Sequence, residues 1–302
     1  MAKTPIAPKE ERAALGVGLM FLAVTCFTGI DSSAKWLILA GIPVLQVVFV
    51  RYAVHFVLGL ALFLPREGLG VLRSKTPKLQ ILRSFCLLMM SILNFQALEF
   101  LPLTVATTIL FAGPIVVTLM AIPLLGEKVG ARRLIAVAVG FLGVIVVMQP
   151  WGAAFHPAVF LTFGAVLCAG GYFIITRKIA GTESPATSQL WSSGLSAAVF
   201  LPVALQVWVW PDTITGYLVM GLIGLVGGAG HFAATVAHRF AEASLLAPVI
   251  YFQILSAAII GVLVFDTWPT LWTLVGALII IGSGIYIWHR ERQLGKAPRV
   301  PD

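Results

Sequence analysis

The sequence predicts an all-α polytopic membrane protein with ten transmembrane helices, arranged as two inverted five-helix repeats around a central cavity. Three observations predict this fold class: the apolar composition, the lengths of the apolar runs and an internal repeat. Hydrophobic residues make up 59% of the 302 positions and charged residues 11%. Soluble proteins average about 45–50% and about 25%, so the composition leaves no room for a sizeable soluble domain.

Apolar windows, separated by charged or proline- and glycine-rich breaks, are long enough to cross a hydrocarbon layer of about 30 Å. The first, from about Ala13 to Leu39, is too long for the hydrophobic region of a cleaved signal peptide. We therefore interpret it as the first retained helix. In chain order, the ten predicted spans are 14–38, 44–64, 80–99, 103–124, 131–148, 158–177, 187–207, 213–236, 243–265 and 268–288.

The positions of Lys and Arg predict the orientation, because membrane proteins retain these residues on the cytoplasmic side. With ten spans both termini lie on one side, and every Lys and Arg except Lys35 and Arg51 is assigned to that side, Arg83 included. Both termini are therefore predicted to be cytoplasmic, in a multi-pass protein of the cell (inner) membrane. Since topology explains the net charge of +8, the lipid bilayer is an expected partner and nucleic acid is not.

An internal repeat divides the chain into two predicted units, residues 14–148 and 158–288. Within it, Ala97–Val147 aligns with Ala237–Ile287 without a gap. Because each unit has an odd number of helices, the second unit inserts upside down relative to the first. Inverted repeats packed around a site at the membrane midplane are typical of secondary transporters.

The two halves also share motifs with a known family. The stretch ALEFLPLTVATTILFAGPIVVTLMAIPLLGEKVGARRLIAVAVGFLGVIVVMQP contains a mid-helix Pro114, a Gly126-Glu127 turn and the basic pair Arg132-Arg133. The second half repeats the pattern in GAGHFAATVAHRFAEASLLAPVIYFQILSAAIIGVLVFD, although Phe265-Asp266 replaces the Gly-Glu turn. Across residues 14–288 the chain resembles the EamA-type transporters of the drug/metabolite transporter superfamily. The resemblance implies a ten-helix transporter of small metabolites with a central cavity, and aromatic amino-acid exporters as the nearest branch.

No catalytic motif is found in the sequence, which has no P-loop, GxSxG or HExxH pattern. The three cysteines lie in apolar stretches without metal-ligand spacing, so no enzyme activity, metal or cofactor is expected. An intramembrane hydrolase would need a nucleophile and a base in one cavity, and Ser91 with His231 is the plausible couple. An ion channel would need a symmetric ring or a charged filter, which a monomeric inverted repeat does not offer.

We therefore predict a secondary, non-ATP transporter that functions as a monomer and exports small metabolites by alternating access. Amino acids, aromatic or otherwise neutral, are the favoured cargo. The alternative is a permease for another small metabolite, such as a nucleotide-derived cofactor or a sugar conjugate. A proton is the candidate coupling ion.

Charged residues inside or at the ends of spans are candidate gating groups, because they are costly in a bilayer. Asp31 and Lys35, four residues apart, can pair along one helix, either at a gate or as a pair that reaches toward the interface. Arg51 is a candidate to bind a carboxylate or to pair with Asp31, with snorkelling as the alternative. Glu99 is either a proton site or an exposed carboxylate at a helix end.

The candidate substrate-binding residues combine aromatic surfaces for an apolar group with polar side chains for an amino-acid end. His231 is the sharpest candidate, because imidazole titrates near neutrality. The predicted hinge residues are Gly113, Pro114 and Pro248, because proline removes a backbone hydrogen bond and bends a helix. The predicted substrate-binding set is Asn94, Phe95, Phe111, Tyr172, Trp191, His231, Tyr251 and Gln253.

Overall fold

The computed structural model describes residues 12–125, 130–152, 155–179, 181–241, 246 and 249–296, and within these ranges it contains helices and no strand. Its helices are α1 (Ala13–Leu39), α2 (Val44–Glu67), the short 3₁₀ helix η1 (Leu69–Leu72), α3 (Pro77–Leu98), α4 (Leu103–Leu110), α5 (Gly113–Leu125), α6 (Ala131–Met148), α7 (Val159–Ile179), α8 (Pro185–Gln206), α9 (Ile214–Phe240), α11 (Phe252–Phe265) and α12 (Leu271–Lys296).

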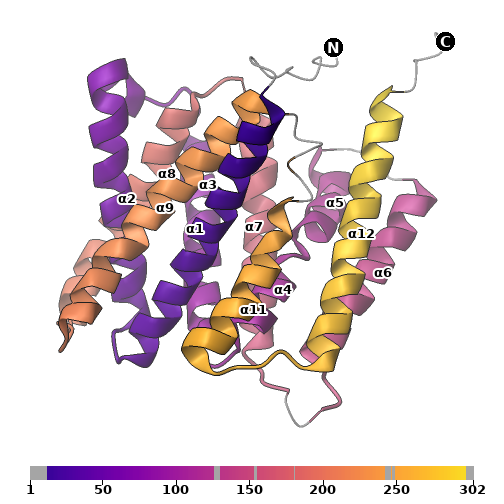
Figure 1. Cartoon of the computed structure of the whole chain (residues 1–302). Helices are drawn as coiled ribbons and strands as arrows, with labels where there is room; N and C mark the ends of the chain where they lie inside the picture. Colours follow the sequence, from indigo (N-terminus) through magenta and orange to yellow (C-terminus); the bar gives the residue numbers. More distant parts are fainter. Residues whose placement is uncertain are drawn as a thin grey trace.

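Eight helical segments are long and apolar enough to cross a membrane, and two shorter apolar helices cover Leu134–Met148 and Phe252–Phe265. The helices lie side by side in one bundle, with α1 beginning and α12 ending at the same end (Figure 1). This arrangement supports a multi-pass membrane protein. The count of ten spanning helices stays a prediction.

The closest helix pairs join the two halves of the sequence. Helix α1 packs against α9, α3 against α7, α2 against α8, and α6 against α12. Each pair combines one helix from residues 14–148 with one from residues 158–288. Two units related by a pseudo-two-fold axis would pack in this way, although the inverted repeat itself stays a prediction.

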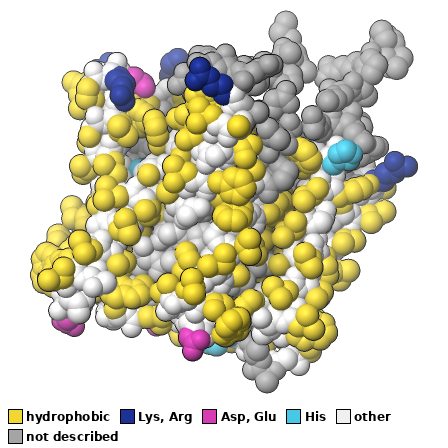
Figure 2. All heavy atoms as spheres, viewed as in Figure 1, with side chains coloured by type: hydrophobic (Ala, Val, Ile, Leu, Met, Phe, Trp, Pro, Cys, Tyr) yellow, Lys and Arg dark blue, Asp and Glu magenta, His cyan; other side chains and the backbone are white. Residues whose placement is uncertain are grey.

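Charged side chains are unevenly distributed on the face seen in Figure 2. Lys and Arg gather toward the end where α1 begins, and hydrophobic side chains cover much of the remaining surface. An apolar belt with basic residues at one end is the pattern expected of a protein that crosses a bilayer.

The predicted span 103–124 is not one helix, because the backbone turns at Phe111 and Ala112 between α4 and α5. Helix α5 begins at Gly113, so Pro114 lies in its first turn, where the missing N–H of proline costs no helical hydrogen bond. The predicted hinge at Gly113 and Pro114 therefore lies at the start of a new helix instead of within a kinked one. Pro248, the other predicted hinge, lies outside the described residues.

Candidate functional site

The interior of the bundle contains more basic than acidic side chains. Among the described residues, the buried acid is Asp31 and the buried bases are Lys35, Arg51 and Arg83, with His55 beside them. No ion pair within 4.0 Å joins Asp31 to any of the three bases in this part of the chain. The charges are therefore stabilised by neutral partners, and the interior keeps an excess of positive charge.

Asp31 and Arg51 are both attached to one face of α3. Asn94 Nδ2 donates a hydrogen bond to Asp31 Oδ1 (3.1 Å), and Arg51 Nη1 donates one to Ser91 Oγ (3.0 Å). Ser91 and Asn94 are three residues apart on α3, so they are neighbours on its surface. The predicted pairing of Arg51 with Asp31 is thus replaced by an arrangement in which α3 holds the two charges side by side.

Aromatic rings cover the guanidinium of Arg51. Its central carbon lies 5.1 Å from the ring centre of Tyr52 and 5.4 Å from that of Phe95. Phe95 is fully buried, and Tyr52 Oη lies 2.6 Å from Ser91 Oγ. Cation–π contacts of this kind hold a cation in the bilayer without neutralising its charge.

Arg83 is the main residue that the sequence analysis placed wrongly. It was counted with the basic residues of the cytoplasmic side, although the predicted span 80–99 includes it, and it lies in the second turn of α3 with 4% of its surface exposed. Its guanidinium donates to Thr176 Oγ1 (2.7 Å), Ser188 O (2.9 Å), Ser192 Oγ (2.6 Å) and Tyr172 Oη (2.6 Å).

A signal for Arg83 was present in the sequence. Gln80, Arg83, Ser91 and Asn94 follow steps of three and eight residues, which place them on one face of α3. A polar stripe of this length inside a span faces other helices and not lipid. Counting Arg83 with the basic residues of the cytoplasmic side obscured this stripe.

Two histidines and a phenylalanine form a ring group beside the charged residues. The rings of His55 and His231 stack at 5.5 Å, and the ring of Phe27 lies 5.0 Å from that of His231. His55 Nε2 also contacts Gln189 Nε2 on α8. Phe27 precedes Asp31 by one turn of α1, and His55 follows Arg51 by one turn of α2. Because α1 and α2 run in opposite directions, both rings are displaced toward the same end of the bundle (Figure 1).

The expected pairing of Asp31 with Lys35 is wrong. Lys35 Nζ instead donates to the backbone oxygens of Leu98 and Leu101, both at 2.7 Å, where α3 ends. The last carbonyls of a helix lack helical partners and attract a cation. Lys35 therefore binds these carbonyls instead of Asp31, its neighbour along α1. Glu99 lies exposed at the same helix end, where its Oε2 accepts a hydrogen bond from Gln96 Nε2 (3.0 Å).

The remaining predicted residues lie at different places along the bundle. Phe111 and Tyr251 face each other with ring centres 5.4 Å apart, and Gln253 is half-buried just beyond Tyr251. Trp191 Nε1 donates to Leu72 O (3.0 Å) at η1, so Trp191 contacts the end of the bundle where α1 begins. The structure therefore brings Asn94 and Phe95 to the charged residues, Tyr172 to Arg83 and His231 to His55, but not Trp191.

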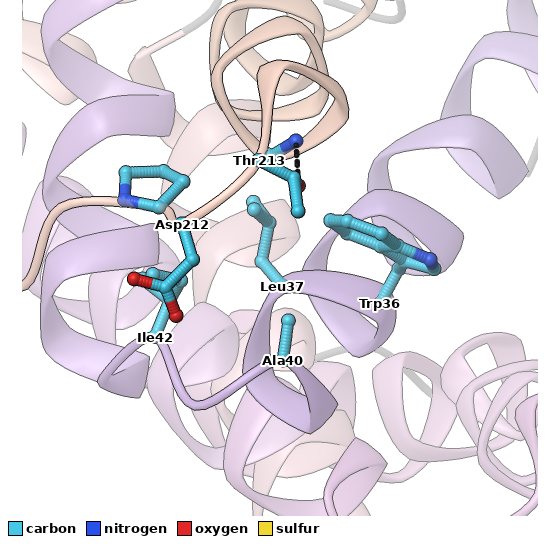
Figure 3. A pocket seen from close by; sticks show the side chains of 8 residues that line it. Trp36, Leu37, Ala40, Ile42, Asp212 and Thr213 are labelled. Carbon is cyan, nitrogen blue, oxygen red and sulfur yellow. Dashed lines mark hydrogen bonds between the residues drawn. The ribbon is translucent and has the colours of Figure 1, made fainter.

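Two hollows lie near the ends of the bundle. One, of about 190 Å³, is lined by Trp36, Leu37, Asp212 and Thr213 among others (Figure 3). Thr213 caps α9 there by accepting a hydrogen bond from Gly216 N (3.1 Å), the dashed line in Figure 3. The other hollow, of about 240 Å³, includes Glu183. Neither includes a residue of the central polar groups, so the central cavity stays a prediction.

Hydrogen bonds join the two halves at each end. At one end, Gln46 exchanges two hydrogen bonds with the backbone of Val209 (2.7 and 2.8 Å). At the other, Glu183 Oε1 accepts from Ser74 Oγ (2.7 Å) and from Thr76 N and Oγ1 (2.7 and 2.8 Å). These contacts join the two halves at both ends of the bundle.

The Glu183 contact is expected to weaken in acid. Burial raises the pKa of Glu183, but the hydrogen bonds from Ser74 and Thr76 lower it by more than burial raises it. The pKa of Glu183 therefore lies below the ordinary value of 4.5. Because the pKa is lowered, the ionised carboxylate of Glu183 stabilises the folded protein fully at a pH above the ordinary pKa. This stabilisation is lost as the pH falls through the lowered pKa. Thermal unfolding across this range is expected to show a smaller acid-induced loss for Glu183→Gln than for the unsubstituted protein. Equal losses would mean that the carboxylate charge does not matter.

A family model described as the EamA-like transporter family matches residues 14–149 and 156–288. The chain belongs to the EamA-like transporter family. It is therefore a membrane transporter of small metabolites and not an enzyme, which confirms the expectation from the sequence motifs.

Relatives of this EamA-like transporter are named for particular substrates. The S-adenosylmethionine uptake transporter of Rickettsia prowazekii is 27% identical, with the match covering 76% of this chain and 78% of the relative. The riboflavin transporter of Rhizobium johnstonii is 26% identical, covering 99% of both. These names do not support the aromatic amino-acid exporter branch or amino-acid export. A solved crystal structure has the same fold, with a TM-score of 0.62 and 18% identity over 93% of this chain and 99% of the other.

Proposed function

We propose that this EamA-like protein is a permease for a cofactor-type metabolite that joins a heteroaromatic ring system to a strongly polar group. The observation that carries the proposal is the pair of relatives named for S-adenosylmethionine and riboflavin, which match 76% and 99% of the chain. S-adenosylmethionine and riboflavin each join a heteroaromatic ring system to a polar group. The proposal takes up the alternative to amino-acid export.

The geometry of the interior supports the same class of cargo. The rings of Phe27, His55 and His231 offer flat surfaces near the buried charges of Asp31 and Arg51. A ligand pocket that places a few polar groups among aromatic side chains fits a molecule with both a ring and a polar chain. Transport then proceeds by alternating access in a monomer of the cell inner membrane, with cytoplasmic termini, driven by substrate or proton gradients.

Uptake into proteoliposomes that contain the purified protein tests the proposal. Labelled S-adenosylmethionine and riboflavin are offered with and without an imposed proton gradient, and empty liposomes serve as the control. We expect saturable uptake of at least one of the two, and faster uptake with the gradient if a proton is coupled. Movement of phenylalanine, tryptophan or threonine, with none of either cofactor, would restore amino-acid export and overturn the proposal.

A further inference from the structure

Two buried atoms near Asp31 lack a hydrogen-bond partner within the described part of the chain. One is Nε of Arg51, a donor on a cation, and the other is Oδ1 of Asn94, an acceptor. Arg51 is 9% exposed and Asn94 is 3% exposed, so water does not readily reach either group. Buried polar groups in native proteins are nearly always paired, and an exception indicates a missing partner.

The unpaired donor and the unpaired acceptor belong to side chains that meet at one face of α3. Arg51 is bound to Ser91 and Asn94 to Asp31, and Ser91 and Asn94 are neighbours on one face of α3. Asp31 and Arg51 are therefore held on the same face of α3. Asp31 accepts one side-chain hydrogen bond from the described residues, the one from Asn94, and so retains capacity for further donors.

The signs of the neighbouring charges restrict what can bind there. A simple anion on Arg51, such as phosphate, would lie beside the carboxylate of Asp31 and be repelled. A simple cation on Asp31 would lie beside the guanidinium of Arg51. A group that carries a carboxylate and an ammonium on the same carbon atom satisfies both charges and both unpaired atoms.

We infer that Asp31, Arg51 and Asn94 bind an α-amino-acid group on the substrate. Arg51 Nε donates to the carboxylate, and the ammonium donates to Asp31 and to Asn94 Oδ1. The inference rests on the proposed function and narrows it, because S-adenosylmethionine carries such a group and riboflavin carries neither charge. Riboflavin would leave the charges of the site uncompensated.

The ring group lies where the other end of such a substrate must be. Phe27 and His55 are each four residues from the charged pair on their own helices, a rise of about 6 Å toward the same end of the bundle. In S-adenosylmethionine a short chain separates the amino-acid group from the adenine ring. One molecule can therefore contact Arg51 and Asp31 at one end and the rings of Phe27, His55 and His231 at the other.

A matched pair of ligands tests the inference without changing the protein. S-adenosylhomocysteine and 5′-methylthioadenosine share the nucleoside and the thioether, but 5′-methylthioadenosine lacks the α-amino-acid group. In equilibrium dialysis we expect S-adenosylhomocysteine to bind the purified protein at least about 10-fold more tightly than 5′-methylthioadenosine. The reason is that 5′-methylthioadenosine cannot make the charge-assisted hydrogen bonds of the α-amino-acid group. Equal affinities for the two ligands would overturn the inference.

Variants then locate the effect. Arg51→Gln and Asn94→Ala are each expected to weaken the binding of S-adenosylhomocysteine and to leave the binding of 5′-methylthioadenosine unchanged. Arg66→Gln, which replaces an exposed arginine of α2, should change the binding of neither ligand. Asn94→Ala spares the contacts of Arg51 with Ser91 and Tyr52, so it serves if Arg51→Gln fails to fold. Unchanged discrimination in a folded variant of either residue would contradict the assignment.

The outcomes also separate this inference from the proposed function. Riboflavin uptake, with equal binding of the two adenosine ligands, would keep the proposed function and refute the amino-acid site. Arg51-dependent binding of methionine and S-adenosylhomocysteine, with no uptake of either cofactor, would keep the site and refute the function.

Discussion

Replacing Arg83 with leucine is expected to reduce substrate uptake by about 10-fold or more, and to lower the free energy of unfolding by about 2–5 kcal/mol. Its four hydrogen bonds connect α3 to α7 and α8, that is, the first half of the chain to the second. Leucine removes this donor from the hydroxyl of the half-buried Tyr172 and from the buried Ser192. Uptake per folded protein and the thermal unfolding midpoint measure the two effects.

Lysine at the same position should rescue only part of the loss. Its ammonium has three hydrogens and no planar fork, whereas the guanidinium of Arg83 serves four acceptors on two helices. Lys78→Leu is the matched control, because Lys78 is an exposed cation on the same helix. If Arg83→Leu retained full uptake and stability, the connection between the two halves would have to depend on other contacts.

The helices could be predicted from the apolar runs, but the partners of the polar side chains could not. Spacing along α1 predicts that Asp31 pairs with Lys35, because position is the information that a sequence contains. In the fold, Asp31 meets Asn94, and Lys35 meets the carbonyls of Leu98 and Leu101. These partners lie more than 60 positions away along the chain. Packing between helices decides which helices face each other, and the periodicity of a single segment does not predict these contacts.

The substrate class was also beyond the sequence motifs. The motifs in residues 97–150 identify the family correctly, but one fold can serve members with different cargo, so the motifs do not identify the substrate. The buried charges were also only partly recognised, because Arg83 was counted with the basic residues of the cytoplasmic side. A helical stripe from Gln80 to Asn94 would have placed it inside the bundle.

Valine in place of Gly276 is expected to destabilise the pair formed by α6 and α12 by about 1–3 kcal/mol. A Cβ atom at Gly276 would lie 2.7 Å from the backbone oxygen of Gly143, and it would also overlap the side chain of Val147. A Cβ atom at Gly143 would in turn lie 3.0 Å from the oxygen of Gly276. The two backbones approach each other through glycine, as helices in membranes often do.

Gly282→Val, on the same helix, supplies the control, because no atom lies within 4 Å of a Cβ built there. Its thermal unfolding midpoint should match that of the unsubstituted protein, and that of Gly276→Val should fall. None of the buried charges among the described side chains lies on α6 or α12, so the folded fraction of Gly276→Val is expected to bind ligand with unchanged affinity. A loss of affinity at full stability would mean that this pair shapes the substrate site, because the contact would then act on binding and not on packing.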